Sequence, residues 1–597
     1  MPMRSRSSWP AAGSAGCAAP RPPPGRSSPP QRSTLSRSGA GADGCPCCGG
    51  CCSPRRWRTG NSGDARNHTG CTRSFVRYGC WHIICWAADH RTPSAHSIDR
   101  DTALSRTRQA FLIAAGWLAH SLGAGPGLAD QVIHIDAGRL SLCGDRGFQL
   151  VRLDGGVLQP VTGSPMVPEL ARNILLPPGC EAAGIEIIPA VPETIRLSAP
   201  LLPCPAPATV GAGEPTATGA MDPSIYRSDQ PFPGALARLT GQGSMAGYRF
   251  ASIAISPVQY IPAKNILLYH RSLGIRVKTR RTPPATMPPS GRSQAFRRMA
   301  GLIAADPANL ARYDDGSTGH AAGPVPLAPH GADDPYEYLI VTSARLAPAL
   351  APLARWKTDK GVRARIMLTD SIAAAFPGAD PAERLRACIK RERDRSGIGW
   401  VLLAGDIDHV PHRVAAGYPG DLYYSDLDGD WNLDGDGTWG EPEDGVDLYP
   451  DVFVGRLPVA DTVAAGNAVR KIIAYERADS AGYQTKLLFI GADLDAQTPT
   501  GQVKDSIQAW HVAAYTGLSV EKLYPSTPTA LGRSSVLAAL DAGCNLVNFS
   551  DHADYYSMGT GLRTGGGQIY PSDAARLANA GRPAVLYTIG CYNGAFD

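Results

Sequence analysis

Residues 545–597 read NLVNFSDHADYYSMGTGLRTGGGQIYPSDAARLANAGRPAVLYTIGCYNGAFD. Two short apolar runs in this stretch, 545–549 and 584–589, are rich in β-branched and aromatic residues, which is typical of buried strands. The first run leads to His552 and the second to Cys591. If the two strands are parallel neighbours, both side chains lie at the C-terminal edge of one sheet, where open α/β sheets carry their sites. The stretch therefore predicts a Cys–His nucleophile pair.

Upstream of this stretch, residues 336–597 alternate between strand and helix patterns. Strands are predicted at 338–343, 362–368, 400–406, 452–458, 486–493 and 520–524, and helices at 346–360, 382–395, 461–478, 502–516 and 532–543. Strands separated by helices of this length predict right-handed βαβ units and a parallel sheet. We expect an α/β domain in two halves, about 336–458 and 480–597, of which only the second contains both His552 and Cys591.

Cys591 can act as a nucleophile only if its thiol loses a proton easily. An ordinary thiol is mostly protonated at neutral pH, and a neighbouring histidine such as His552 can take that proton. An oxyanion would need main-chain N–H donors, and those of Ala553 and Cys591 are the candidates. On chemistry alone, a cysteine that ends a buried strand is more often a small core residue. A serine hydrolase is disfavoured because the α/β region lacks a G-x-S-x-G motif.

The quoted stretch resembles the gingipain family of cysteine peptidases. The family pattern is a strand ending in Gly-His-Gly and a later strand ending in Cys-x-x-Gly-x-Phe, which Cys591, Gly594 and Phe596 match. Further similarity lies at 245–280, 402–406, 421–431 and 450–458. The resemblance implies a caspase-like parallel-sheet catalytic domain preceded by an inhibitory propeptide. It also implies a cysteine-type endopeptidase in which Cys591 is the nucleophile and His552 the general acid/base.

Two features of the sequence depart from the family pattern around the histidine. Asp551 and Ala553 replace the two flanking glycines, and a carboxylate at 551 is expected to raise the pKa of His552 or to crowd the site. Arginine-specific members have Glu where this chain has Asp493, and we predict that Asp493 orients the imidazole. Asp495 is the alternative residue for that role, and a helix N-cap is the alternative role for Asp493.

The chain stops six residues after Cys591, whereas the family's catalytic domain continues with further sheet and helices. We therefore expect a catalytic domain that is truncated at its C-terminus. The alternative to an active endopeptidase is an inactive protease-fold fragment that acts as a binding or adhesion module. The sequence does not determine which substrate residue is preferred at the P1 position. Asp505, early in the helix after Asp493, could favour a basic P1 side chain.

An acidic loop between the third and fourth strands fits the twelve-position calcium pattern D-x-[DN]-x-[DN]-G-x5-E. The predicted ligands are Asp430, Asn432, Asp434, Asp436 and Glu441, with Asp436 at the position that binds through its main-chain carbonyl. Gly437 stands where EF-hands have an apolar residue, and no helices flank the loop, so we predict structural calcium without an EF-hand fold. Asp426 and Asp428 could bind the same ion or a second one. The alternative is a solvated acidic turn.

The first part of the chain does not read as a folded domain. Residues 1–104 are rich in Arg, Pro, Ser and Gly without periodicity, which predicts a disordered or spurious N-terminal extension. The cluster CPCCGGCC at 45–52 is the basis for the alternative, a metal-binding tail. Residues 105–129 combine basic residues, an apolar run and small residues, which is typical of a signal peptide. We expect a secreted, cell-surface or periplasmic protein without a stable membrane span.

Between the signal-like segment and the α/β region lie two further parts. Residues 131–280 contain short strand-like runs broken by Gly and Pro, which predicts a β-sandwich-like domain. The resemblance identifies this domain as propeptide-like, so the protein is expected to be made as a zymogen. Residues 281–335 are rich in Pro, Ala, Ser and Gly, which predicts a linker that is a cleavage region or a plain spacer.

The charge and cysteine content of the chain restrict the classes of partner and scaffold that we expect. The formal net charge of the 597 residues is +5, but residues 1–104 carry +9, so the rest carries −4. That balance argues against nucleic acid, and it leaves protein or peptide substrates as the expected partners. Six cysteines follow residue 104 without a tight pairing pattern, which argues against a disulfide scaffold.

Overall fold

The computed structural model describes residues 130–145, 147–158, 161–188, 190–206, 220–282, 294–313, 334–415, 417–477, 482–495 and 498–596. The predictions for residues 1–104 and for the signal-like segment 105–129 lie outside the described residues. Within the ranges above, no helix is long and apolar enough to cross a bilayer.

The first described domain is built almost entirely of antiparallel strands, as predicted. Its elements are β1 (Gln131–Asp136), β2 (Leu140–Asp145), β3 (Phe148–Leu153), β4 (Val157–Leu158), β5 (Pro168–Leu175), β6 (Cys180–Ile188), β7 (Glu193–Arg196), α2 (Pro223–Tyr226), β8 (Ala237–Met245), β9 (Tyr248–Ile255), β10 (Val258–Ile261), η1 (Pro262–Lys264), β11 (Ile266–Tyr269) and β12 (Ser272–Arg281). The sheets run β1-β12-β6, β10-β11-β7 and β4-β5-β9-β8, with β2-β3 as a hairpin. Along a strand every second side chain faces the same side, and Ile133 of β1, Ile253 of β9 and Ile275 of β12 all point into one shared apolar core.

The predicted linker at 281–335 contains two helical elements, α3 (Gln294–Ile303) and η3 (Pro307–Tyr313). Phe296 is fully buried, and its ring stacks on Phe453 with centroids 4.2 Å apart. Both elements join an apolar cluster with residues of β5, β8 and β9. The described part of this segment is therefore packed rather than a plain spacer, because its few apolar side chains recur at helical spacing.

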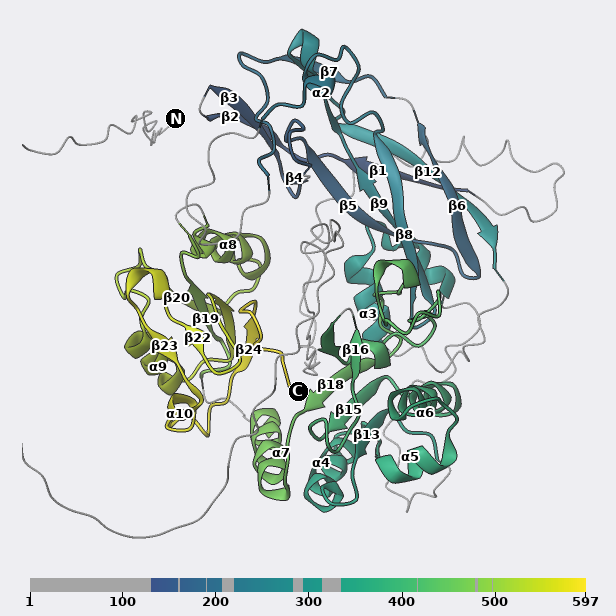
Figure 1. Ribbon diagram of the computed structural model, residues 1–597, viewed down its shortest axis with the longest axis vertical. Helices are drawn as coiled ribbons and strands as arrows, with labels where there is room; N and C mark the ends of the chain where they lie inside the picture. The colour runs from purple at the N-terminus through teal and green to yellow at the C-terminus, as the bar shows by residue number, and fades with distance from the viewer. Residues whose placement is uncertain are drawn as a thin grey trace, which may run out of the picture. The chain divides into compact units, whose positions relative to one another are not determined.

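The first α/β half is a four-stranded parallel sheet in the order β14-β13-β15-β18. Its elements are β13 (Tyr338–Thr342), α4 (Ala347–Asp359), β14 (Ala364–Leu368), α5 (Thr369–Ala375), α6 (Pro381–Ser396), β15 (Trp400–Ala404), β16 (Arg413–Ala415), β17 (Tyr418–Gly420), η4 (Leu422–Tyr424), η5 (Pro442–Asp444), β18 (Phe453–Leu457) and α7 (Thr462–Arg477). Leu339 and Val341 face α5 and α6, whereas Ile340 faces α4 and α7 (Figure 1). Helices therefore cover both faces, as buried parallel strands require.

The second half repeats this plan in the order β20-β19-β21-β24, again parallel. Its elements are β19 (Lys486–Gly491), α8 (Thr500–Ile507), η6 (Gln508–Val512), β20 (Ser519–Leu523), α9 (Arg533–Ala542), β21 (Leu546–Ser550), β22 (Met558–Gly559), η7 (Leu562–Thr564), β23 (Gln568–Ile569), α10 (Pro571–Ala574) and β24 (Val585–Thr588). Leu488 and Ile490 pack toward α9, and Leu487 and Phe489 pack toward α8. The predicted α/β fold class is confirmed.

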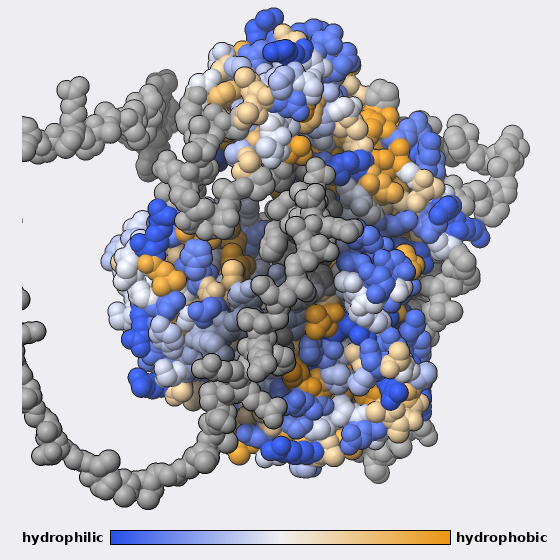
Figure 2. Space-filling model, in the orientation of Figure 1, coloured by the Kyte–Doolittle hydropathy of each residue, from blue (hydrophilic) through white to orange (hydrophobic). Residues whose placement is uncertain are grey.

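The strand order creates a topological switch point in the second half. The chain leaves β19 toward β20 on one side, and β21 lies on the other side of β19. The carboxyl edge of the sheet at such a switch point is where open α/β sheets bind ligands, so the loops that follow β19 and β21 are the ones to examine for a site. Figure 2 shows a largely hydrophilic face with hydrophobic residues in separate patches, as expected of a protein surface in water.

Candidate active site

β21 and β24 are parallel neighbours, and His552 and Cys591 follow their carboxyl ends at equal distance along the chain. Phe549 of β21 is paired with Thr588 of β24. His552 follows Phe549 by three residues, and Cys591 follows Thr588 by three residues. Both side chains are therefore carried by loops that begin at one edge of one sheet. The final pairing is extended by a hydrogen bond from Ile589 N to Phe549 O (3.3 Å).

The loop of Cys591 approaches the loop of His552 closely. A Cβ atom at position 590 would lie 2.6 Å from the Cβ of Ala553, so only glycine fits there without displacing a neighbour. The Gly590 N–H donates to Thr588 Oγ1 (3.0 Å), and Thr588 Oγ1 lies 2.9 Å from Asn593 Oδ1. The turn that presents the thiol is thus fixed to its own strand and packed against the histidine loop.

The His552 ring is positioned by a main-chain carbonyl. Its Nε2 lies 3.2 Å from Leu494 O, in the loop that follows β19. Because a carbonyl oxygen only accepts, this contact requires a proton on Nε2 and leaves Nδ1 as the basic nitrogen of the neutral ring. Among the described residues, Leu494 O is the only hydrogen-bond partner of the ring. Asp493 precedes Leu494 in this loop and forms an isolated bridge with Pro499.

Asp493 is not the N-cap of the helix that follows it, which was the alternative role predicted for this residue. Helix α8 begins at Thr500 with Pro499 at its N-cap, and no side chain caps it. Asp505, the suggested determinant of a basic P1 preference, accepts hydrogen bonds from Lys522 Nζ (2.7 Å) and from the hydroxyl of Tyr524 (3.2 Å). A basic substrate side chain would have to compete with Lys522 for this carboxylate.

Asp551 does not face the imidazole in the way that its sequence position indicated. Its side chain is buried, with one oxygen 2.7 Å from the N–H of His552 and the other 2.6 Å from the N–H of Gly561. The carboxylate therefore ties the start of the histidine loop to its return. A Cβ atom at position 559 would lie 2.7 Å from this carboxyl group, so Gly559 provides the space that Asp551 occupies.

Two main-chain N–H groups of the site have no acceptor within the part of the protein that the structure describes. Ala553 and Met558 are opposite each other in a short antiparallel β-bridge. The hydrogen bond of this bridge joins their neighbours, from Gly559 N to His552 O (2.8 Å), so Ala553 and Met558 form a non-hydrogen-bonded pair and the Ala553 N–H is not used in the bridge. Among the described residues, neither this N–H nor that of Cys591 donates a hydrogen bond to the protein. These are the two groups that the sequence predicted as oxyanion donors.

Cys591 differs from most other described cysteines in its accessibility. It is exposed and free, whereas Cys180, Cys204, Cys388 and Cys544 are buried. Burial raises the pKa of the Cys544 thiol to about 11, which keeps that thiol protonated and unreactive. Only Cys143, in the β-rich domain, is also exposed among the cysteines that the structure describes.

One residue near the site was not singled out from the sequence. Lys504 of α8 is almost fully buried, and its Nζ contacts Asn548 Oδ1 and Ser550 Oγ of β21. Burial lowers the pKa of Lys504 to about 8. Ser550 lies two residues before His552, so this lysine supports the strand end that carries the histidine. A lysine in a short amphipathic helix reads as a surface residue, so the sequence contained no signal for this contact.

Two family models match this chain. Residues 331–597 match Peptidase family C25, and residues 143–289 match its propeptide, Propeptide_C25. The peptidase match thus covers the α/β domain, and the propeptide match covers most of the β-rich domain. The predicted resemblance is therefore confirmed.

This chain is distantly similar to named peptidases of Porphyromonas gingivalis. Gingipain R2 is 20% identical over 380 residues, which cover 62% of this chain and 46% of that protein. Lys-gingipain is 24% identical over 341 residues, which cover 52% of this chain and 16% of that protein. The chain thus spans less than half the length of these relatives. The crystal structure of the Arg specific cysteine proteinase gingipain R is 18% identical with a TM-score of 0.35, covering 45% of this chain and 57% of that chain.

The acidic loop of the C25 domain gathers three of its five predicted ligands. Asp434, Asp436 and Glu441 each place a carboxylate oxygen within 4.8 Å of the others. Partial burial and the carboxylates of Asp436 and Asp434 raise the pKa of Glu441. Gly435 has a φ of +74°, which provides the predicted sharp turn. Asp436 contributes its side chain to this group, whereas the pattern predicted its main-chain carbonyl.

The other two predicted ligands shape the loop itself. Asp430 Oδ1 accepts a hydrogen bond from Asn432 N (3.1 Å), and Asn432 Oδ1 accepts one from Gly437 N (3.0 Å). The first bond forms an Asx turn, in which a short polar side chain accepts from the main-chain N–H two residues on, and the second spans five residues across the loop. Asp434 and Asp436 accept similar bonds from the N–H groups of Asp436 (3.2 Å) and Thr438 (2.6 Å), so residues inside and outside the carboxylate group both shape the loop.

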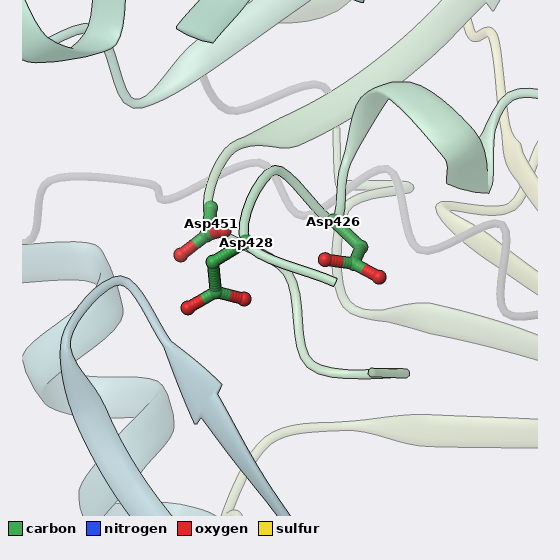
Figure 3. A group of neighbouring side chains, drawn as sticks. All are labelled: Asp426, Asp428 and Asp451. Carbon is green, nitrogen blue, oxygen red and sulfur yellow. The ribbon is translucent and has the colours of Figure 1, made fainter. Parts of the chain in front are cut away.

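Asp426 and Asp428 belong to a different acidic group, which Asp451 completes. Figure 3 shows Asp428 and Asp451 next to each other with Asp426 alongside. Asp451 is buried, accepts from Ala246 N (3.2 Å) of the β-rich domain and lies 3.1 Å from the Arg393 guanidinium. Burial raises the pKa of Asp451 to about 7, although Arg393 acts to lower it. This group therefore already has a cationic partner in the protein.

Proposed function

We propose that this chain is a cysteine endopeptidase of the C25 type, in which Cys591 is the nucleophile and His552 the general acid/base. The observation that supports it most is the parallel pairing of β21 and β24, whose carboxyl ends lead into the loops of the two residues. Close packing of Gly590 against Ala553 adds to this, because it holds the two loops together. The exposure of Cys591 leaves its thiol open to a substrate.

The proposed reaction begins with transfer of the Cys591 thiol proton to Nδ1 of His552. Nδ1 is available because Nε2 contacts Leu494 O. The thiolate then attacks the scissile carbonyl carbon, and the C–N bond breaks as the imidazolium returns the proton to the leaving amine. Water, deprotonated by the same imidazole, releases the acyl group from the sulfur. The unpaired N–H groups of Ala553 and Cys591 are proposed to bind the oxyanion of each tetrahedral intermediate.

Asp493 is proposed to act on the side of the ring opposite the thiol. It adjoins Leu494, whose carbonyl contacts Nε2. A carboxylate in this loop would favour the imidazolium that forms during the reaction, as the third member of a triad does. The main-chain carbonyl and Asp493 would thus divide the orienting role that the sequence assigned to Asp493 alone.

The zymogen proposal rests on the β-rich domain, which matches the C25 propeptide at residues 143–289. The hairpin of β8 and β9 donates main-chain N–H groups to acidic residues of the α/β domain, from Ser244 to Asp447 (2.6 Å) and from Ala246 to Asp451 (3.2 Å). We propose that these contacts hold the propeptide on the catalytic domain. Export of the protein is proposed from the signal-like segment 105–129.

Calcium is proposed as a structural ion of the acidic loop. Three exposed or half-buried carboxylates that converge without a basic partner fit a hard divalent cation, and such an ion would relieve the repulsion that raises the pKa of Glu441. Asp434, Asp436 and Glu441 would hold the ion. It would supply charge neutralisation and fix the loop, and it would take no part in peptide-bond cleavage.

Peptide hydrolysis by the full chain tests the proposed function. After calcium addition and limited proteolysis, the wild-type protein should cleave a mixed fluorogenic peptide library, and Cys591→Ala and His552→Ala should not. Cys143→Ala is the matched control, because Cys143 is the other exposed cysteine of the described residues and should be dispensable. Absence of cleavage by a folded, processed wild-type chain would instead support the binding or adhesion module.

A further inference from the structure

The histidine loop and the cysteine loop each carry an exposed tyrosine close to the reactive residue. Tyr555 follows His552 by three residues, and Tyr592 directly follows Cys591. Their rings are stacked, with centroids 4.5 Å apart and an angle of 22° between the planes. Both side chains remain more than half exposed, at 58% and 51%. The stack therefore joins two loops at the surface and is not part of the hydrophobic core.

The backbone of Tyr592 adopts an unfavourable conformation. Its φ is +57°, in the left-handed region that residues with a bulky side chain rarely occupy. Glycine or asparagine would be expected at such a position. A tyrosine there indicates that an interaction of its ring offsets the backbone strain, and the stack on Tyr555 is that interaction.

Cys591 lies between two contacts with the histidine loop. On one side, Gly590 packs against Ala553 so closely that a Cβ at 590 would lie 2.6 Å from the Cβ of Ala553. On the other side, Tyr592 stacks on Tyr555. A segment held at both ends cannot rotate away from its partner without breaking one of the two contacts.

We propose that Tyr555 and Tyr592 are positioning residues whose stacked rings clamp the loop of Cys591 to the loop of His552. The inference rests on the proposed function, because the clamp sets the geometry of the pair that would carry out catalysis. Loss of the stack lets the thiol move away from the imidazole. A misplacement of about 1 Å can lower a catalysed rate about 100-fold. The two tyrosines would act by positioning the loops, and the proposal does not require either ring to contact the substrate.

Substitutions at Tyr592 separate the ring from the backbone strain. Tyr592→Phe keeps the stack and should retain wild-type kcat within about twofold. Tyr592→Gly relieves the strain but removes the ring, and kcat should fall about 10- to 100-fold with a much smaller change in KM. Tyr555→Ala should match Tyr592→Gly, and the double variant should be no worse than either single variant. Tyr515→Ala removes a tyrosine that is 67% exposed elsewhere in the same half and serves as the control.

The alkylation rate of Cys591 by iodoacetamide, followed against pH by peptide mapping on the full chain, provides a readout without turnover. Wild type and Tyr592→Phe should react at low pH as a thiolate paired with an imidazolium, whereas Tyr592→Gly should require a pH nearer that of an ordinary thiol. Wild-type kcat and an unshifted profile in Tyr592→Gly would overturn the clamp while leaving the proposed function intact. A wild-type profile that His552→Ala does not change would instead count against the Cys–His pair itself.

Discussion

Replacement of Asp551 by alanine should loosen the histidine loop and destabilise the C25 domain. The buried carboxylate accepts main-chain hydrogen bonds from His552 (2.7 Å) and Gly561 (2.6 Å). A hydrogen bond to a charged group contributes about 1.5–3 kcal/mol, so losing two lowers the free energy of unfolding by about 3–6 kcal/mol. Asp551→Asn keeps one carbonyl acceptor and should lose about half of that amount.

Hydrogen exchange read residue by residue provides the assay. Since about 1.4 kcal/mol corresponds to a tenfold change, the Gly561 N–H should exchange about 100-fold faster in Asp551→Ala. Asp554→Ala is the matched control, because Asp554 lies in the same loop but is exposed, and its carboxylate accepts from the nearby Tyr556 N (2.8 Å). If Asp551→Ala left both the exchange of Gly561 and the thermal midpoint unchanged, the role assigned to this carboxylate would be refuted.

Three further predictions concern a buried charge, a close contact and an ion. Burial lowers the pKa of Lys504 from 10.5 to about 8. Between pH 8 and pH 10.5 the unfolded chain therefore binds more protons than the folded chain, and the free energy of unfolding should rise by up to about 3 kcal/mol as the pH increases over that range. The thermal midpoint of Lys504→Met should not rise with pH in this way. The same dependence of the thermal midpoint on pH in the wild type and in Lys504→Met would contradict the prediction. Gly590→Ala should lower peptide hydrolysis about tenfold or more by pushing on Ala553, with partial recovery when Ala553→Gly is added; full activity in the single variant would disprove the contact. A calcium chelator should lower the thermal midpoint of the wild type but not of Asp434→Asn/Asp436→Asn, and equal sensitivity would exclude this loop as the site.

The parallel sheets could be predicted because their strands are buried on both faces. Runs such as 486–493 and 545–549 are mostly apolar and are bounded by helical segments, so both their type and their order follow from the pattern. The shared edge of the strands that lead to His552 and Cys591 followed in turn, since parallel neighbours end at one edge. The linker was predicted less well, because the helix around Phe296 depends on apolar partners that lie far away in the sequence.

The parts of the site that could not be predicted depend on contacts across loops. Nothing in the sequence pairs the Leu494 carbonyl with His552, because any residue type provides a carbonyl. Asp551 was expected to perturb the imidazole, but the chain folds back at Gly561 and supplies an N–H that turns the carboxylate away. The stack of Tyr555 on Tyr592 requires the φ of +57° at Tyr592, which the residue type itself argues against.

Covalent labelling of the full chain by a peptidyl acyloxymethyl ketone, with the modified residue identified by peptide mapping, tests the central claim most directly. We expect an adduct on Cys591 in the protein activated with calcium and limited proteolysis, and we expect that adduct to be lost in His552→Ala. The exposed Cys143 should remain unmodified, because it has no place in the proposed pair. No adduct on Cys591, or labelling that persists unchanged in Cys591→Ala, would contradict the account.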